Sequence, residues 1–238
     1  MKVDIVEAVD SDRSPNSNDH LLVRELTHRI NNEFTSIIGH TSLMAARSSN
    51  AEVKDALSGV SRLLHHCADI HRALQIPALS TLIDASSYIR TLCQSIRRAR
   101  LENRNIELVF VEYPILISSD RCWRLGMIVS ELITNSMRHA FDGRGGTIRV
   151  ELSSSGPYVE CCVMDNGSSR ERREPGQGLK IVEALAKELN GNAVYRFGPK
   201  GAFSVVIFPI DEDAPQMESH FWINEDNRDN RRRAASPF

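Results

Sequence analysis

Two stretches of helical hydrophobic periodicity dominate the first third of the chain. Residues 1–18 are polar and are predicted to form a flexible tail. Apolar side chains then recur at helical spacing from about residue 20 to residue 48, and again from 53 to 74. A short polar break separates the two stretches. Residues 19–77 are therefore predicted to form an antiparallel helical hairpin.

The apolar stripes of this hairpin also predict self-association. Two helices alone bury too little apolar surface to form a stable core. Pairing with a second copy into a four-helix bundle covers both stripes. The sequence thus predicts a homodimer that is held together by the hairpin.

A different pattern fills residues 84–210, where short apolar runs alternate with amphipathic helices. It predicts a mixed sheet with helices laid on one face, an α/β sandwich. We expect helices at 84–100, 120–140 and 178–189, and strands at 106–111, 116–118, 147–153, 158–164, 192–197 and 202–209. The predicted fold class is α+β, a helical hairpin followed by this sandwich.

The last segment, residues 211–238, is charged and lacks periodicity, so it is predicted to be a disordered tail. Within it, Phe221, Trp222 and Ile223 form an apolar group that could dock on another surface. The first tail, with 18 residues, leaves no room for a sensor domain. The input signal is therefore expected to come from a separate protein.

The composition of the chain argues against two classes of partner, nucleic acids and membranes. The chain of 238 residues has a net charge of −2 and gives no sign of a nucleic-acid groove or a membrane-binding surface. No apolar run reaches the roughly 18 residues that a membrane span needs. The five cysteines are odd in number and lack the spacing of a metal site, which favours a reducing, cytoplasmic setting.

The predicted helix at 120–140 carries an unusual set of polar side chains. Glu131, Asn135 and His139 follow one another at intervals of four residues, with Arg138 beside the histidine, so they share one helix face. A carboxylate can hold water or a metal-bound water, an amide oxygen can bind Mg²⁺, and positive charge suits phosphate oxygens. The alternative is a solvated helix face whose polar spacing arose by chance.

Two further motifs follow. Asp165 ends a buried apolar strand, where its carboxylate could accept a hydrogen bond from an amine such as that of adenine, and Gly167 allows a tight backbone. Gly176 and Gly178, followed by Leu179, open the next helix, where bare N–H groups and the helix dipole favour an anion. The alternatives are a plain turn and a flexible helix entry.

One histidine of the hairpin lies away from the apolar stripe. His28 is expected to face solvent, with Glu25 and Asn32 beside it on the same helix face. A neighbouring carboxylate can hold one ring nitrogen and leave the other free to attack phosphorus. The alternative is a surface histidine without a role.

The second half of the chain resembles the ATP-binding domain shared by sensor histidine kinases, DNA gyrase, Hsp90 and mismatch-repair ATPases. The similarity covers about residues 84–209 and rests on the motifs described above. It implies that Asn135 binds Mg²⁺, that Glu131 positions water or the metal shell, and that Asp165 contacts adenine with the help of Gly167. It also implies phosphate binding by one further set of residues, Arg138, His139, Gly176 and Gly178, with Leu179 beside the nucleotide.

The hairpin resembles the phosphoacceptor segment of the HWE-like and subgroup-two histidine kinases. His28, followed by arginine, matches the phosphorylated histidine, and Glu25 and Asn32 match their positions in that motif. Asn31 differs from the usual lysine. His71 matches a second family histidine on the second helix, although a bundle-surface role fits it equally well.

The combined resemblance implies an ATP- and Mg²⁺-dependent protein-histidine kinase. His28 would receive the phosphoryl group and pass it to an aspartate of a response-regulator receiver domain. Three departures favour an alternative, a histidine phosphotransfer protein whose ATPase-like domain only docks partners: Ser169 replaces a glycine, Ala202 replaces a threonine, and the lid between Gly167 and Gly176 is very short. A serine kinase of the anti-sigma type is a third alternative, but it has no need of the hairpin.

Overall fold

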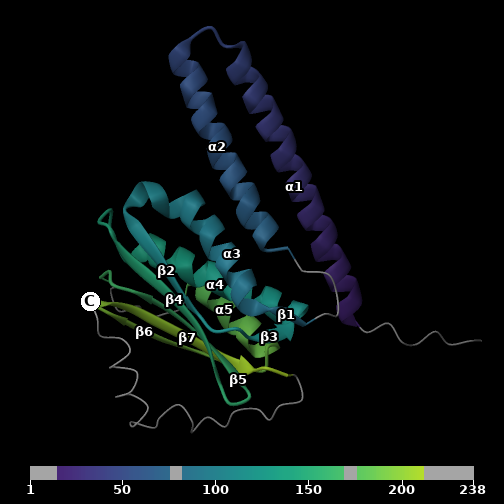
Figure 1. Ribbon diagram of the computed structural model, residues 1–238, viewed down its shortest axis with the longest axis vertical. Helices are drawn as coiled ribbons and strands as arrows, with labels where there is room; N and C mark the ends of the chain where they lie inside the picture. Colours follow the sequence, from purple (N-terminus) through teal and green to yellow (C-terminus); the bar gives the residue numbers. More distant parts are fainter. Residues whose placement is uncertain (1–14, 76–81, 169–175, 212–238) are drawn as a thin grey trace, which may run out of the picture.

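The computed structural model of the protein describes residues 15–75, 82–168 and 176–211 (Figure 1). Two long helices, α1 (Pro15–Arg47) and α2 (Ala51–Ala73), form the predicted antiparallel hairpin. Helix α1 begins earlier than expected, because proline is well tolerated at the first helical position, where its missing N–H is not needed. In the turn, the Asn50 side chain caps α2 by accepting hydrogen bonds from the backbone N–H groups of Glu52 and Val53.

A five-stranded mixed sheet forms the second part of the molecule, in the order β2-β4-β5-β7-β6. Strands β2 and β4 are parallel, and the other neighbours are antiparallel. The strands are β2 (Ile106–Glu112), β4 (Gly146–Ser155), β5 (Tyr158–Asp165), β6 (Asn192–Gly198) and β7 (Gly201–Pro209).

Three helices cover one face of this sheet (Figure 1). They are α3 (Ala85–Ile96), α4 (Ser119–His139) and α5 (Gln177–Glu188). Their apolar sides and the inward positions of the strands form one continuous core, in which residues such as Ile89, Ile133 and Phe208 are fully buried. The predicted α+β fold, a hairpin followed by an α/β sandwich, is confirmed.

Two local features were not predicted. A short strand, β1 (Leu82–Asp84), pairs with β3 (Leu116–Ser118) in a separate two-stranded ribbon. Helix α3 ends at Ile96 rather than near residue 100, and a π-helical turn (Arg97–Leu101) and a 3-10 turn (Glu102–Arg104) follow it. Helical propensity continues through this region, so only tertiary packing decides which kind of helical turn forms.

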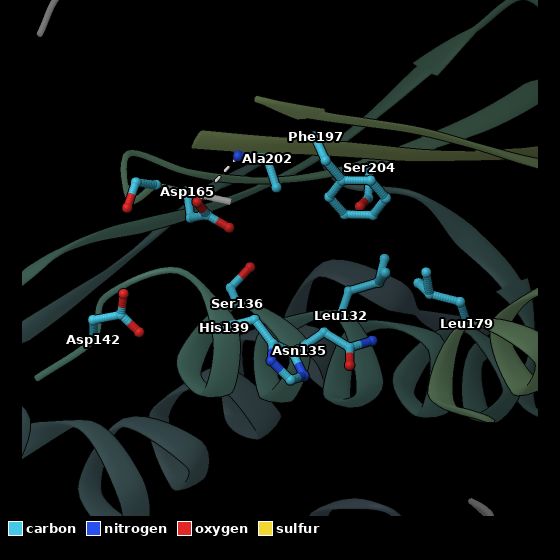
Figure 2. Close-up of a pocket in the computed structure, with 11 residues that line it drawn as sticks. Leu132, Asn135, Ser136, His139, Asp142, Asp165, Leu179, Phe197, Ala202 and Ser204 are labelled. Atoms are coloured by element: carbon cyan, nitrogen blue, oxygen red, sulfur yellow. Dashed lines mark hydrogen bonds between the residues drawn. The ribbon is translucent and has the colours of Figure 1, made fainter. Parts of the chain in front are cut away.

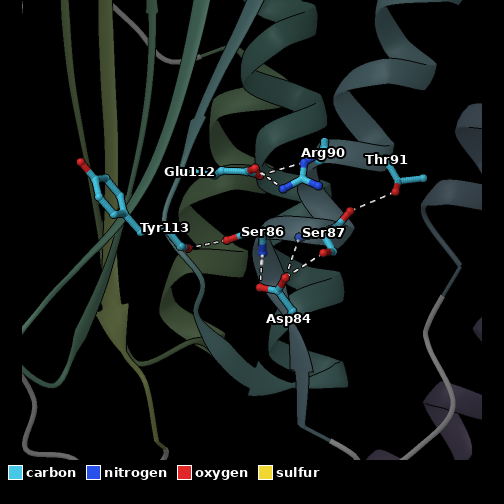
Figure 3. A network of polar contacts seen from close by, with 7 residues as sticks. All are labelled: Asp84, Ser86, Ser87, Arg90, Thr91, Glu112 and Tyr113. Carbon is cyan, nitrogen blue, oxygen red and sulfur yellow. Dashed lines mark hydrogen bonds and ion pairs between the residues drawn. The ribbon is translucent and has the colours of Figure 1, made fainter.

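The start of α3 is fixed by a polar network (Figure 3). Asp84 caps the helix by accepting hydrogen bonds from the backbone N–H groups of Ser86 and Ser87, and the Ser87 hydroxyl bond lowers the pKa of this carboxyl. The Ser86 hydroxyl donates to the carbonyl of Tyr113. These contacts hold α3 against the segment between β2 and β3.

One buried arginine fixes the position of α4. Arg121 is 3% exposed, and its guanidinium donates to the carbonyls of Leu189 and Pro209 and lies over the ring of Phe208. Helix α4 is thereby tied to the ends of α5 and β7. These three elements also form the site described below.

The end of the hairpin packs on the sandwich. Ile70 of α2 is buried in the same core cluster as α3 and α4, and the indole N–H of Trp123 donates to the carbonyl of Leu74 over 2.9 Å. Every helix in the described ranges is too short or too polar to cross a lipid bilayer.

Candidate functional site

A cavity of about 370 Å³ lies between α4 and the sheet, and we refer to it as the interlayer pocket (Figure 2). Helix α4 supplies one wall, and the ends of β5, β6 and β7 supply the other, with the start of α5 beside them. The lining residues are Leu132, Asn135, Ser136, His139, Asp142, Asp165, Ser168, Leu179, Phe197, Ala202 and Ser204. The pocket therefore gathers residues from several of the predicted motifs.

Asp165 presents a free hydrogen-bond acceptor to this pocket. Its Oδ1 accepts from the backbone N–H groups of Gly167 (3.2 Å) and Ala202 (3.1 Å), and the second of these bonds is visible in Figure 2. Its Oδ2 is buried and has no hydrogen-bond partner among the described residues. A buried carboxylate oxygen without a partner is costly, so a ligand with an N–H donor would gain by binding there.

The polar face of α4 reaches the pocket through only part of the predicted set. Asn135 and His139 line the pocket, and the Asn135 Nδ2 is buried without a partner in the described part of the chain. Glu131 is half-buried beside the start of α5 and does not line the cavity. Arg138 is exposed and does not line it either.

The glycines at the start of α5 give the backbone a close approach to α4. A Cβ atom on Gly178 would lie 3.0 Å from the Oε2 of Glu131 and 3.3 Å from the Nδ2 of Asn135. Gly176 is the N-cap of α5, has an extended backbone and provides no side-chain cap. The first turn of α5 therefore has backbone N–H groups without a partner inside the helix. Leu179 is buried and lines the pocket.

Gly167 serves packing against α4 rather than contact with the cavity. Its Cβ would lie 2.2 Å from the carbonyl oxygen of Ala140, and the backbone N–H of Ser168 donates to that same oxygen over 2.8 Å. The chain after β5 must therefore pass directly over the end of α4. This close approach positions Asp165 at the pocket.

We expect Gly167→Ala to destabilise the protein by about 1–3 kcal/mol, because the new methyl group meets backbone that cannot yield. Thermal unfolding followed by circular dichroism measures the change. Gly59→Ala on α2 is the matched control, since no atom lies within 4 Å of its Cβ and alanine favours a helix. Equal melting temperatures for the two variants would contradict the packing role of Gly167.

Several pocket residues were missed by sequence reasoning. Phe197 of β6 and Ser204 of β7 line the cavity, as do Ser136, Asp142 and Ser168. Strand alternation gave a usable signal for one of them, because Ser204 lies two residues after Ala202 and so faces the same side of the sheet. Its hydroxyl offers a polar group on the strand where Ala202 lacks one.

His28 lies on α1, outside the interlayer pocket. Its side chain is exposed, as predicted, and so is that of Asn32. The Glu25 carboxylate pairs with Arg29 at 2.9 Å and not with His28, which corrects the predicted pairing. Arginine four residues after a glutamate carries a permanent charge and reaches it easily, whereas the histidine side chain is shorter.

His71 on α2 faces the first helix. Its ring lies 5.3 Å from that of Phe34, and partial burial together with the charge of Arg100 lowers its pKa. The contact with Phe34 fits a role on the surface of the hairpin. Ser169, and with it the predicted lid, and the apolar group Phe221 to Ile223 lie outside the described residues.

The described residues contain no group of three or more His, Cys, Asp or Glu side chains that could enclose a metal ion. A metal in the interlayer pocket would instead take ligands from Asn135 and from a bound anion. Mg²⁺ fits such a site, because it usually keeps water and phosphate ligands and needs few protein oxygens.

Two family models together match most of the chain. Residues 25–100 match a family model described as "Histidine kinase", and residues 95–202 match one described as "Histidine kinase-like ATPase domain". The first match spans most of the hairpin and α3, and the second contains every residue that lines the interlayer pocket except Ser204.

Individual relatives agree. The sensor histidine kinase PdtaS of Mycobacterium tuberculosis is 27% identical over 212 residues, which cover 86% of this chain and 42% of the relative. Blue-light-activated histidine kinase 2 of Erythrobacter litoralis is 24% identical over 229 residues, which cover 89% of this chain and 63% of the relative. The chain thus spans about two fifths of the length of PdtaS.

Solved structures support the same fold. The histidine kinase domain of the Erythrobacter litoralis EL346 blue-light-activated kinase superposes with a TM-score of 0.54 at 20% identity. The superposition covers 74% of this chain and 96% of that domain.

Proposed function

Because the chain belongs to the histidine kinase family, with the HWE-like type of phosphoacceptor hairpin, we propose that it is an ATP-dependent protein-histidine kinase of two-component signalling. ATP binds in the interlayer pocket, and its γ-phosphoryl group passes to His28. An aspartate on the receiver domain of a response regulator then takes the phosphoryl group. We also propose a cytoplasmic setting, since all five cysteines are free thiols.

The observation that carries this proposal is the bare Oδ2 of Asp165. The exocyclic amine of adenine is a donor of the kind that this atom lacks. Phe197, Leu132 and Leu179 add apolar surface to the same cavity, which suits the faces of a purine ring. Asp165 and these three side chains would hold the base.

The phosphates and the metal would bind along the polar face of α4, apart from the base. Asn135 would hold Mg²⁺ through its amide oxygen, and Glu131 would position water or the metal shell. His139 and the glycine-rich start of α5, Gly176 and Gly178, would hold phosphate oxygens. Arg138, exposed beside His139 on the same helix, would add positive charge for phosphate oxygens. When bound, Mg²⁺ supplies charge neutralisation on the phosphates.

The transfer step places one demand on the hairpin. A ring nitrogen of His28 forms a bond to the γ-phosphorus, the bond to the bridging oxygen breaks, and ADP leaves with the electron pair. The exposed ring then loses its N–H proton to solvent. His28 does not line the pocket, so the ATP-binding domain must approach α1 of its own chain or of a second chain.

The deciding experiment is incubation of the purified protein with γ-labelled ATP and Mg²⁺, followed by treatment with acid. We expect label that is acid-labile, as phosphohistidine is. A protein that binds fluorescent ATP analogues but shows only acid-stable label would be a serine kinase. Absence of both ATP binding and labelling would favour the phosphotransfer protein.

We further propose that the protein is a dimer, because the hairpin leaves its apolar stripes bare. Of the large apolar side chains that are exposed in the described residues, nine lie on α1 or α2, and they include Leu26 (58%), Ile37 (49%) and Val60 (48%). Such a surface is typical of a protein interface. A second hairpin would cover it in a four-helix bundle.

Light scattering is expected to give twice the 26.7 kDa mass of one chain at micromolar concentration. Ile37→Glu combined with Val60→Glu should produce the monomer, since both charges would be buried at the interface. Leu82→Glu is the control, because Leu82 is even more exposed (65%) but lies on β1. A wild-type monomer, or dissociation by the control alone, would overturn the hairpin dimer.

A further inference from the structure

The face of the sheet opposite the helices carries a second apolar cluster. It is formed by seven residues of β5, β6 and β7, and we refer to them as the outer cluster: Tyr158, Cys162, Met164, Val194, Phe203, Val205 and Ile207. They occupy the alternate strand positions, whose side chains point away from the main core. Neighbouring strands bring them together, since Val205 is paired with both Cys162 and Val194.

This face is shielded although no described helix contributes to it. Val205 is 3% exposed, Ile207 is 6% exposed and Cys162 is 9% exposed. Helices α3, α4 and α5 all pack on the other side of the sheet (Figure 1). An apolar sheet face of this kind needs a cover, because antiparallel sheets that leave one face in water carry polar residues there.

We propose that the outer cluster is the docking site for the C-terminal segment of the same chain, residues 212–238, with Phe221, Trp222 and Ile223 as the anchor. The distribution of charge on this face favours this occupant over a second protein. On the same face, the cluster is bordered by charged residues, which are Arg149 and Glu151 of β4, Glu160 of β5 and Arg196 of β6. The apolar part is therefore one small patch, and β7, the strand from which the chain exits, runs through it.

The place where the described chain ends puts the anchor within reach. Strand β7 ends at Pro209, which is paired with Tyr158 of the outer cluster, and the N–H of Ile210 bonds to the carbonyl of Pro157. Ten residues, 211–220, separate this exit from Phe221. Ten extended residues reach roughly 33 Å, which exceeds the length of any strand in this sheet.

Composition fits the anchor equally well. Between residues 211 and 238, Phe221, Trp222 and Ile223 are the only three consecutive large apolar residues, and acidic residues stand on both sides of them. A short apolar group between polar flanks is suited to one small apolar surface. Aromatic side chains also lose little conformational entropy when they are ordered.

Docking on this face would stiffen the floor of the interlayer pocket. Met164 of the outer cluster directly precedes Asp165, and Phe203 directly follows Ala202, whose N–H bonds to Asp165. This consequence for nucleotide binding rests on the proposed function. The docking itself does not, and its test needs no nucleotide.

The test uses the thiol of Cys162 as a probe of the cover. The full chain and the variant Phe221→Ala/Trp222→Ala/Ile223→Ala are treated with N-ethylmaleimide, and labelling is measured at each cysteine by mass spectrometry. Cys162 should react about tenfold faster or more in the variant. Without the anchor the cluster is uncovered in a larger fraction of the molecules, so the reagent reaches the thiol more often. Cys93, which is buried under the helices, should stay unlabelled in both proteins.

The matched control is Asn224→Ala/Glu225→Ala/Asp226→Ala, which changes three adjacent polar residues and should leave the Cys162 rate unchanged. Equal Cys162 rates in the full chain and in the anchor variant would overturn the proposal. Faster labelling of Cys93 together with Cys162 would also overturn it, since that result means general unfolding. Protection of Cys162 that vanishes on dilution would assign the anchor to a second copy and overturn docking within one chain.

Trp222 gives an independent readout, as the chain has only one other tryptophan, Trp123. Subtracting the emission of Trp222→Phe from that of the full chain isolates Trp222. Blue-shifted emission with resistance to acrylamide quenching is expected from the docked ring. Emission typical of a tryptophan in water, readily quenched, would reject the assignment.

Discussion

His28→Ala should abolish acid-labile labelling by γ-labelled ATP while leaving ATP affinity and dimerisation unchanged. The imidazole is the only nucleophile that the proposed reaction uses, so nothing replaces it. The side chain is exposed on α1 and makes no contact with the interlayer pocket, and its loss should therefore not disturb the fold. Filter-bound label, fluorescent-ATP titration and light scattering measure the three properties.

His40→Ala is the matched control for this experiment. His40 is also an exposed histidine of α1, and its ring nitrogen bonds to the carbonyl of Ser36. Its removal should leave labelling at the wild-type level. Wild-type, acid-labile labelling of His28→Ala would reject the phosphoacceptor assignment and direct attention to His71.

Asn135→Ala and Asp165→Asn are expected to separate catalysis from nucleotide binding. Asn135→Ala should lower the rate of autophosphorylation by about 100-fold or more, since losing a ligand to the metal removes stabilisation of the transferring phosphoryl group worth several kcal/mol. ATP affinity should fall much less. The base contacts of Asp165 remain intact in this variant.

Asp165→Asn should act in the opposite way. The two backbone N–H groups that bond to Oδ1 hold the side chain in place, so an amide group turns its NH₂ toward the position of Oδ2. A donor then faces the adenine amine, which is also a donor. We expect the dissociation constant for ATP to rise about 10- to 100-fold, equivalent to ~1.4–2.8 kcal/mol.

Thermal stability separates these effects from general damage. Each substitution could act only by loosening a helix or a turn, and then nucleotide affinity, labelling rate and melting temperature would fall together in both variants. Opposite patterns in affinity and rate, with melting temperatures close to the wild type, support the proposed roles. A parallel loss of all three would contradict them.

Sequence reasoning was most accurate where one element alone decides the outcome. The interval of four residues between Asn135 and His139 placed both on the same side of α4, and both line the pocket. Leu179 followed in the same way from the start of α5. The position of a residue on a helix is a local property, because the helix repeats every 3.6 residues whatever surrounds it.

Contacts between side chains were less predictable, even within one helix. Glu25 has both His28 and Arg29 within reach, and the structure pairs it with Arg29. Spacing alone does not rank competing partners, since the outcome depends on charge, reach and solvent exposure.

The sequence by itself thus determined the order of hairpin and sandwich, the polar face of α4 and the exposure of His28. Only the tertiary structure decided that Phe197 and Ser204 reach the same cavity as Asn135, because β6 and β7 meet α4 through contacts between distant parts of the chain. It also decided that one oxygen of Asp165 is satisfied by Gly167 and Ala202 while the other is left free. Residues 37 positions apart come together only after the strands have paired, and no local periodicity records that event.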